Sequence, residues 1–349
     1  MSRFLRRLAA PLMFLLALPP AAGAECFGMN ILDIMPAAER QALEAAANAV
    51  PYPEGNFWTA EKGATRLIVI GTYHLDDPRH QAAVDRLAPE IAGAAALLVE
   101  GGPEEEKALV AHMAENPSVM TITEGPTLLE SLPEATWKRL SAAMSERGIP
   151  GFMAAKLQPW YVTVLLSVPP CAMEDLVDPK GLDGMLIDAA LAAGVPVRAL
   201  EPYDTVFKLF DSFSRAEQVD MIEQTLALEP SITDFSITLA DAYFDGKGRL
   251  MWELMRHQSY AMEGYTRAQV DEEMARMEDV LMVQRNRAWI PVIEAAADAG
   301  PLVVVAFGAL HLSGEDGVLN LLAENGWTVA PMVLPWPITV SPPRIVALA

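Results

Sequence analysis

Two histidines stand in the same short motif at two distant points of the chain. Residues 67–75 read LIVIGTYHL and residues 303–312 read VVVAFGALHL, so each apolar run ends in Gly-x-x-His-Leu. Imidazole nitrogens bind transition metals and exchange protons near neutral pH. A single such histidine is most simply a strand cap, but a repeated motif favours a shared function. We therefore interpret His74 and His311 as parts of one site.

Carboxylates follow two further apolar runs in the same manner. Glu100 comes directly after the run at 95–99, and Glu201 follows the run at 195–200. Because the carboxyl ends of parallel strands meet at one edge of a sheet, we expect both acids to lie beside the two histidines. Arg285 and Asn286 in a predicted helix either hold a carboxylate or an oxyanion, or are ordinary polar residues of that helix.

Two histidines with one or two carboxylates favour a divalent transition metal, namely Mn²⁺, Co²⁺, Zn²⁺ or Fe²⁺. A metal held by His74, His311 and Glu100 would acidify a water and polarise a carbonyl, which predicts metal-assisted hydrolysis. Glu100 is either the third ligand or the general base. Arg285 would stabilise the oxyanion, while Glu201 and Asn286 would orient the ligands. The chain has no HExxH, GxSxG or P-loop motif.

The elements around these residues predict an α/β fold with a central, largely parallel sheet. Apolar runs without polar alternation are typical of strands buried on both faces. Residues 56–70 indicate a hairpin that leads into His74, and a last strand is expected near 327–334. The region 205–290 contains no convincing strand, and we expect it to be a helical insertion that covers the sheet edge. Its Met274, Met277 and Met282 line either a peptide groove or, more simply, a helix–helix core.

The other histidines carry less information. His80 follows His74 closely, but its helical phase predicts a solvated side chain. His112 and His257 stand in polar helical surroundings and are expected at the surface. The helix after His74 is expected over 81–87, with Pro89 interrupting the chain beyond it.

The N-terminus resembles a secretory signal peptide. A basic segment, an apolar segment and the small residues Ala22-Gly23-Ala24 predict cleavage after Ala24, leaving one α/β domain over residues 25–349 with no membrane span. We therefore expect a periplasmic or secreted protein. In an oxidising compartment the two cysteines, Cys26 and Cys171, are expected to form a disulfide, with free thiols as the alternative.

The charge balance excludes some partners. The chain has 25 Lys and Arg against 46 Asp and Glu, a net charge of −21. Residues 1–24 contain three Arg and no acid, so the mature chain would carry −24. Such acidity disfavours nucleic acid and anionic lipid as partners.

Seven segments together resemble the TraB/PrgY/GumN family, which includes the Tiki-type metalloproteases. They are GTYHLDD at 71–77, LLVEGG at 97–102, KLQPW at 156–160, GLDGML at 181–186, ALEPYD at 199–204, RNRAW at 285–289 and GALHLSGEDGVLNLL at 308–322. The fold similarity extends to erythromycin-esterase-like and haem-binding ChaN-like proteins. By this resemblance His74 and His311 match the paired GxxH histidines, Glu100 the strand-end acid, and Arg285 and Asn286 the Arg-Asn pair. Glu100 departs from the family pattern in being followed by Gly-Gly-Pro.

For the Tiki-type branch, the resemblance implies a metal-dependent peptidase that works with Mn²⁺ or Co²⁺ on a peptide or protein substrate. It also implies two alternatives. One is a non-catalytic periplasmic protein that binds and sequesters a signalling peptide. The other, weaker alternative is a haem-binding protein with Tyr73 or a histidine as the axial ligand.

Overall fold

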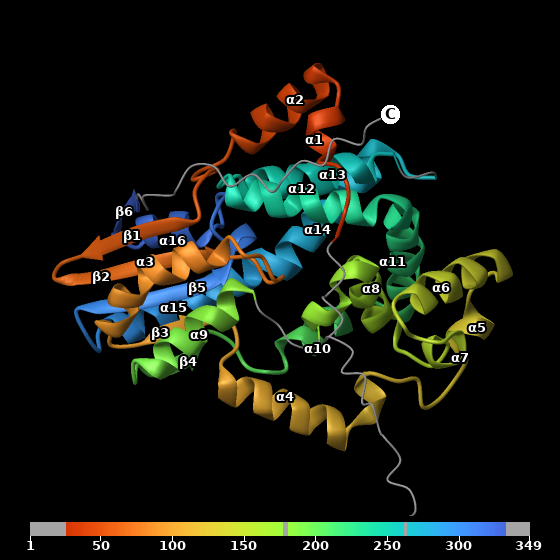
Figure 1. Ribbon diagram of the computed structural model, residues 1–349, viewed down its shortest axis with the longest axis horizontal. Coiled ribbons are helices and arrows are strands. Elements are labelled where there is room, and N and C mark those ends of the chain that lie inside the picture. Colours follow the sequence, from red (N-terminus) through yellow and green to blue (C-terminus); the bar gives the residue numbers. More distant parts are fainter. Residues whose placement is uncertain (1–25, 177–180, 262–263, 333–349) are drawn as a thin grey trace, which may run out of the picture.

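A six-stranded sheet forms the centre of the protein, whose computed structural model describes residues 26–176, 181–261 and 264–332 (Figure 1). The expected signal peptide lies outside the described residues. The strands are β1 (Phe57–Lys62), β2 (Thr65–Thr72), β3 (Leu97–Val99), β4 (Val197–Ala199), β5 (Leu302–Gly308) and β6 (Thr328–Pro331). Their order is β4-β3-β5-β2-β1-β6. The first four run parallel, whereas β1 pairs antiparallel with β2 and β6, so the predicted mostly parallel sheet is confirmed.

Helices surround the sheet and build a second, helical half of the molecule (Figure 1). They are α1 (Ile31–Ile34), α2 (Ala37–Ala47), α3 (His80–Ala92), α4 (Pro103–Glu115), α5 (Leu128–Ser131), α6 (Glu134–Glu146), α7 (Gly151–Ala154), α8 (Pro159–Ser167), α9 (Leu182–Ala192), α10 (Thr205–Asp211), α11 (Arg215–Leu228), α12 (Ile232–Phe244), α13 (Gly248–Ser259), α14 (Arg267–Glu278), α15 (Gln284–Ala297) and α16 (Val318–Glu324). None of the helices in these described ranges is long and apolar enough to cross a membrane.

Both faces of the parallel strands are buried, which explains their unbroken apolar sequences. In β2, Ile68 and Ile70 face a layer formed by α3 and α9. The alternate residues Leu67 and Val69 face α15 and α16, where Trp289 fills the core. The sheet is therefore the middle layer of an α/β/α arrangement, as its composition predicts.

The strand order places the two GxxH motifs side by side. β5 comes late in the chain but inserts between β2 and β3, with Gly71 opposite Phe307 and Thr72 opposite Gly308. Adjacent strands lie only ~4.8 Å apart. His74 and His311, which follow these strands, thus emerge at the same point of the sheet edge.

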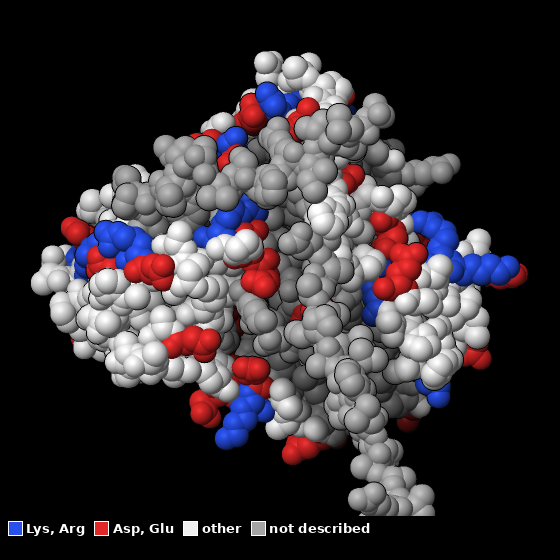
Figure 2. Space-filling model, viewed as in Figure 1, with Lys and Arg blue, Asp and Glu red and all other residues white. Residues whose placement is uncertain are grey.

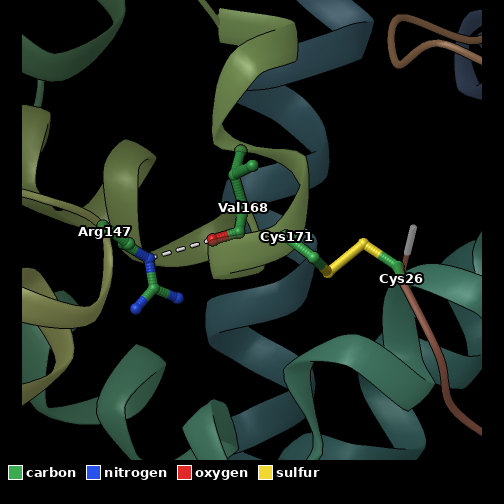
Figure 3. Close-up of a disulfide and its surroundings, with 4 residues drawn as sticks. All are labelled: Cys26, Arg147, Val168 and Cys171. Atoms are coloured by element: carbon green, nitrogen blue, oxygen red, sulfur yellow. Dashed lines mark hydrogen bonds between the residues drawn. A yellow bond between two sulfur atoms is a disulfide. The ribbon is translucent and has the colours of Figure 1, made fainter. Parts of the chain in front are cut away.

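The helical half has its own core and a covalent tie to the N-terminal segment. Helices α5 to α8 and α11 share a cluster of buried apolar side chains. Arg147, at the end of α6, donates hydrogen bonds to the carbonyls of Leu165 and Val168, which end α8. The chain then reaches Cys171, whose predicted disulfide with Cys26 is confirmed (Figure 3).

Several predictions about helices can be compared with the structure. As expected, no strand occurs over residues 205–261 and 264–290. That residues 205–290 form an insertion with these limits stays a prediction. Met274 and Met282 are buried against Trp252, which confirms the simpler interpretation of a helix–helix core.

The expected interruption at Pro89 was wrong, because α3 continues through it to Ala92. Pro89 lies on the exposed side of α3, where water can bond the carbonyl that its ring leaves without a donor.

Charged side chains are mixed over the surface. On the face shown in Figure 2, acidic and basic residues lie in small neighbouring groups. Ion pairs such as that of Lys138 with Glu134 are exposed, and such pairs contribute little to stability.

The disulfide should contribute strongly to stability, because it closes a loop of 145 residues. Replacing both Cys26 and Cys171 by Ser should lower the free energy of unfolding by about 2–5 kcal/mol, through the larger conformational entropy of the unfolded chain. Urea denaturation with and without a reductant measures this. The reductant should destabilise the unmodified protein and leave the double variant unchanged; equal stability of the two proteins would contradict the prediction.

Candidate metal and catalytic centre

Each motif glycine allows the turn of the other motif to pack closely against its backbone. A Cβ atom on Gly71 would lie 2.5 Å from Leu312 Cδ1 and 3.0 Å from Ala309 Cα, both in the second motif. A Cβ on Gly308 would lie 3.3 Å from His74 Nε2 and 3.4 Å from Glu100 Oε1. Any larger residue would push the motifs apart. The repeated glycine is thus explained by close approach of the two loops rather than by backbone strain.

His74 is held by the start of α9. Its Nδ1 lies 2.7 Å from Asp183 Oδ2, and Asp183 Oδ1 accepts a hydrogen bond from the Thr72 hydroxyl at 2.5 Å. Gly181 packs directly on the His74 backbone, where a Cβ would lie 2.2 Å from the His74 carbonyl oxygen. The His74 side chain is nevertheless 64% exposed, so its Nε2 is open to a ligand.

Asp183 governs the protonation of His74. Its negative charge raises the pKa of His74 above the ordinary value, against the opposing effect of desolvation. Solvent around the exposed ring screens part of this interaction. The same carboxylate also fixes the ring, because Nδ1–H donates to Asp183 and leaves Nε2 next to Gly308.

Glu100 lies at the centre of the site. Its Oε1 accepts a hydrogen bond from the Gly308 backbone N–H at 2.7 Å, and its Oε2 accepts one from Arg285 Nη2 at 2.6 Å. Burial alone would raise the pKa of Glu100, but the neighbouring His311 and Arg285 lower it to about 2. Glu100 is therefore a carboxylate at neutral pH.

Arg285 bridges the two strand-end acids. Its Nε and Nη2 donate to the two oxygens of Glu201 at 2.8 and 2.7 Å, in addition to the bond from Nη2 to Glu100. Trp289 Nε1 donates to Glu201 Oε2 at 3.0 Å and its ring lies beneath the guanidinium. Of the two interpretations left open for Arg285, the one in which it holds a carboxylate is confirmed.

His311 is buried and oriented by Asn286. Its Nδ1 lies 2.6 Å from Asn286 Oδ1, and its Nε2 lies 3.2 Å from Arg285 Nη1. Because a guanidinium can only donate, Nε2 is the acceptor and Nδ1 carries the proton. Burial and the positive charge of Arg285 lower the pKa of His311 to about 4, although Glu100 acts in the opposite direction. His311 is therefore neutral at pH 7, as a metal ligand must be.

A π-helical segment, Asp279–Val283, immediately precedes Arg285 and Asn286. The extra residue in a π-turn changes the phase of the helix that follows, and such segments frequently occur at functional sites. Here it ends at Val283, directly before α15 begins at Gln284, and the side chains of Arg285 and Asn286 face the sheet edge. Sequence periodicity predicted a helix through this region but not the change of phase.

All the site residues predicted from the sequence lie together, but three partners were missed. They are Thr72, Asp183 and Trp289. Asp183 is in the GLDGML segment, which carries no sign that the start of α9 reaches the His74 loop. Tyr73, the proposed haem ligand, stacks on Tyr243 instead of joining the two histidines.

The prediction for His80 was wrong. The residue is completely buried and its Nε2 lies 3.0 Å from the Leu75 carbonyl oxygen. It begins the apolar face that Ala83, Leu87 and Ile91 continue along α3. His112 and His257, expected at the surface, are half-buried: His112 packs against Tyr203, and His257 lies 3.5 Å from Glu39.

The arrangement has the donors of a metal site, but Arg285 lies among them. Within the described ranges, no three His, Cys, Asp or Glu side chains are arranged to hold a metal ion. His311 Nε2 and Glu100 Oε1 are 4.0 Å apart, and Arg285 contacts both residues. The formal charges of Asp183, Glu100 and Glu201 exceed that of Arg285 by two. The donor types and the orientation of the rings are those of a cation site, although the described side chains are not arranged around one.

Replacing Asp183 by Asn should lower the pKa of His74 toward its ordinary value of 6.5, because the largest influence raising it is removed. Two-dimensional NMR titration of the imidazole resonances measures this shift. The exposed Asp188, farther along α9, provides a matched control: Asp188→Asn should leave the pKa of His74 in place. An unchanged pKa in Asp183→Asn would show that the contact does not control protonation.

Comparison with known protein families supports the sequence resemblance. The model of the TraB/PrgY/gumN family matches residues 56–331, which span the whole sheet and all the site residues described above. A search of curated proteins found no match. On the strength of a match over most of its length, the chain belongs to the TraB/PrgY/gumN family.

Proposed function

We propose that the protein is an exported, metal-dependent hydrolase that cleaves peptide bonds. One observation carries the proposal: two histidines have their Nδ1 atoms tied to oxygens of Asp183 and Asn286, while His311 Nε2 lies 4.0 Å from Glu100 and His74 Nε2 lies, like Glu100, next to Gly308. Metal-binding histidines are usually oriented in this manner by a hydrogen bond to an oxygen. His74, His311 and Glu100 would hold the metal.

The protonation states of His311 and Glu100 support their assignment as ligands, whereas His74, whose pKa Asp183 raises to about 9, would release a proton on binding a cation. His311 is neutral and Glu100 is ionised at pH 7, so neither has to lose a proton before binding a cation. A carboxylate whose pKa is about 2 is a weak general base, because proton transfer is most effective when the pKa lies near the working pH. Of the two roles predicted for Glu100, the structure therefore favours the ligand.

The remaining residues would orient the substrate. When bound, a divalent cation supplies a Lewis acid that acidifies a water and polarises a carbonyl. Arg285 is anchored to Glu201 by two hydrogen bonds, and its Nη1 donates to the Leu281 carbonyl oxygen and to His311 Nε2. If His311 Nε2 bound a cation instead, the second N–H of Nη1 would be released to a carbonyl oxygen. A fixed cation at that position would stabilise the negative charge that develops on this oxygen.

Export is supported by two features. The disulfide between Cys26 and Cys171 is typical of proteins outside the cytoplasm. The N-terminal sequence has the pattern of a cleaved signal peptide.

Metal binding and peptide cleavage should both depend on the paired histidines. In protein prepared without a polyhistidine tag, His74→Ala and His311→Ala should each reduce the affinity for Mn²⁺ or Co²⁺ by more than about 100-fold, since loss of an orienting partner alone costs 10–100-fold. Isothermal titration calorimetry measures the affinity, and cleavage of a quenched fluorescent peptide library measures activity.

His257→Ala is the matched control, because His257 pairs with Glu39 on α2 and takes no part in the site. Retention of metal and turnover by both site variants would refute the proposal. Peptide binding that persists in a chelator without any cleavage would instead identify a sequestering protein, and a Soret band on adding haem would identify a haem protein.

A further inference from the structure

A cavity of about 340 Å³ opens between the first turns of α4 and α10 and reaches the metal and catalytic centre. Its inner end is formed by Glu100 and Glu201, the two acids that hold Arg285. In Figure 1 these helices lie in the lower middle of the molecule, beyond the ends of β3 and β4. A group bound in the cavity would therefore lie next to the bond that the site acts on.

The walls of the cavity combine apolar surface with negative charge. Leu109 of α4 and Val206 of α10 contribute apolar side chains, and Tyr203 contributes an aromatic ring. Glu105 and Glu106 lie at the α4 side, and none of the described residues that line the cavity is Lys or Arg. Arg285 neutralises only one of the two charges of Glu100 and Glu201, so one negative charge remains there, and the two α4 glutamates add two more.

The start of α4 would normally attract an anion, but here it does not offer a free binding site for one. The backbone N–H of Gly102 donates to Glu105 Oε2, and Pro103 has no N–H. The first turn also carries three glutamates, whose formal charge outweighs the partial positive charge of the helix end. These features favour a cation over an anion in the cavity.

We infer that this cavity binds the side chain of a Lys or Arg residue in a peptide substrate. The aliphatic stem of either residue would lie against Leu109 and Val206, as such stems do on apolar surface. The charged end would reach Glu106 and the ring of Tyr203, which provides a cation–π partner. The inference rests on the proposed function, since it names the kind of peptide that the hydrolase would accept.

Binding of matched peptides tests the inference. Fluorescein-labelled alanine-based hexapeptides would carry one test residue at a central position: Lys or its uncharged analogue norleucine, and Arg or its uncharged analogue citrulline. Fluorescence anisotropy is measured with EDTA and again with Mn²⁺. The charged peptides should bind roughly tenfold or more tightly than their analogues, the difference expected for a hydrogen bond to a charged group.

Substitutions on α4 locate the effect. Glu106→Gln should remove most of the preference, and Glu106→Lys should reverse it. Glu104→Gln is the matched control, because Glu104 is an exposed residue of the same turn that does not line the cavity. Circular dichroism confirms that each variant is folded.

Equal binding of the charged and uncharged peptides, equal effects of Glu106→Gln and Glu104→Gln, or no binding of basic peptides would each overturn the inference. Its failure is distinguishable from failure of the proposed function. Metal-dependent cleavage without preference for Lys or Arg overturns only the inference, whereas selective binding of basic peptides by a protein that takes up no metal supports it and overturns the proposed function.

Discussion

The double ion pair that Arg285 forms with Glu100 and Glu201 is the interaction on which the site depends. Its side chain is only 15% exposed, so the guanidinium needs both carboxylates to offset the loss of water. These partners end β3 and β4, while Arg285 itself begins α15. The Arg285 side chain therefore connects α15, which covers one face of the sheet, to the carboxyl ends of β3 and β4. Removing it would leave two carboxylates without their cation at the point where the histidines converge.

This network acts within a scaffold that makes two distant motifs adjacent. Insertion of β5 between β3 and β2 places the GxxH turns next to each other, and the glycines allow the turns to touch. The two histidines nevertheless have different environments. His74 is exposed and paired with Asp183, whereas His311 is buried and paired with Asn286. One ring is thus accessible to an incoming ligand, and the other is held neutral within the protein.

Most of the sheet and the main site residues could be predicted from the sequence. Strands buried on both faces have unmistakable apolar runs, and charged residues directly after them must meet at one sheet edge, as Glu100 and Glu201 do. Contacts between elements could not be predicted. Asp183 reaches His74 only because α9 packs against the loop after β2. His80 was misjudged because a polar residue can continue an apolar helix face when its ring bonds a buried carbonyl, here that of Leu75.

The proposed metal centre requires that Arg285, His74, Glu100 and His311 share one small volume, with the cation taking its place among the donors. Anomalous diffraction from crystals soaked in Mn²⁺ tests this most directly. The account predicts a manganese peak within coordination distance of His74 Nε2, His311 Nε2 and a Glu100 oxygen, at about 2.0–2.3 Å from each. Saturating Mn²⁺ that produces no peak there, or a peak only at other residues, would contradict it.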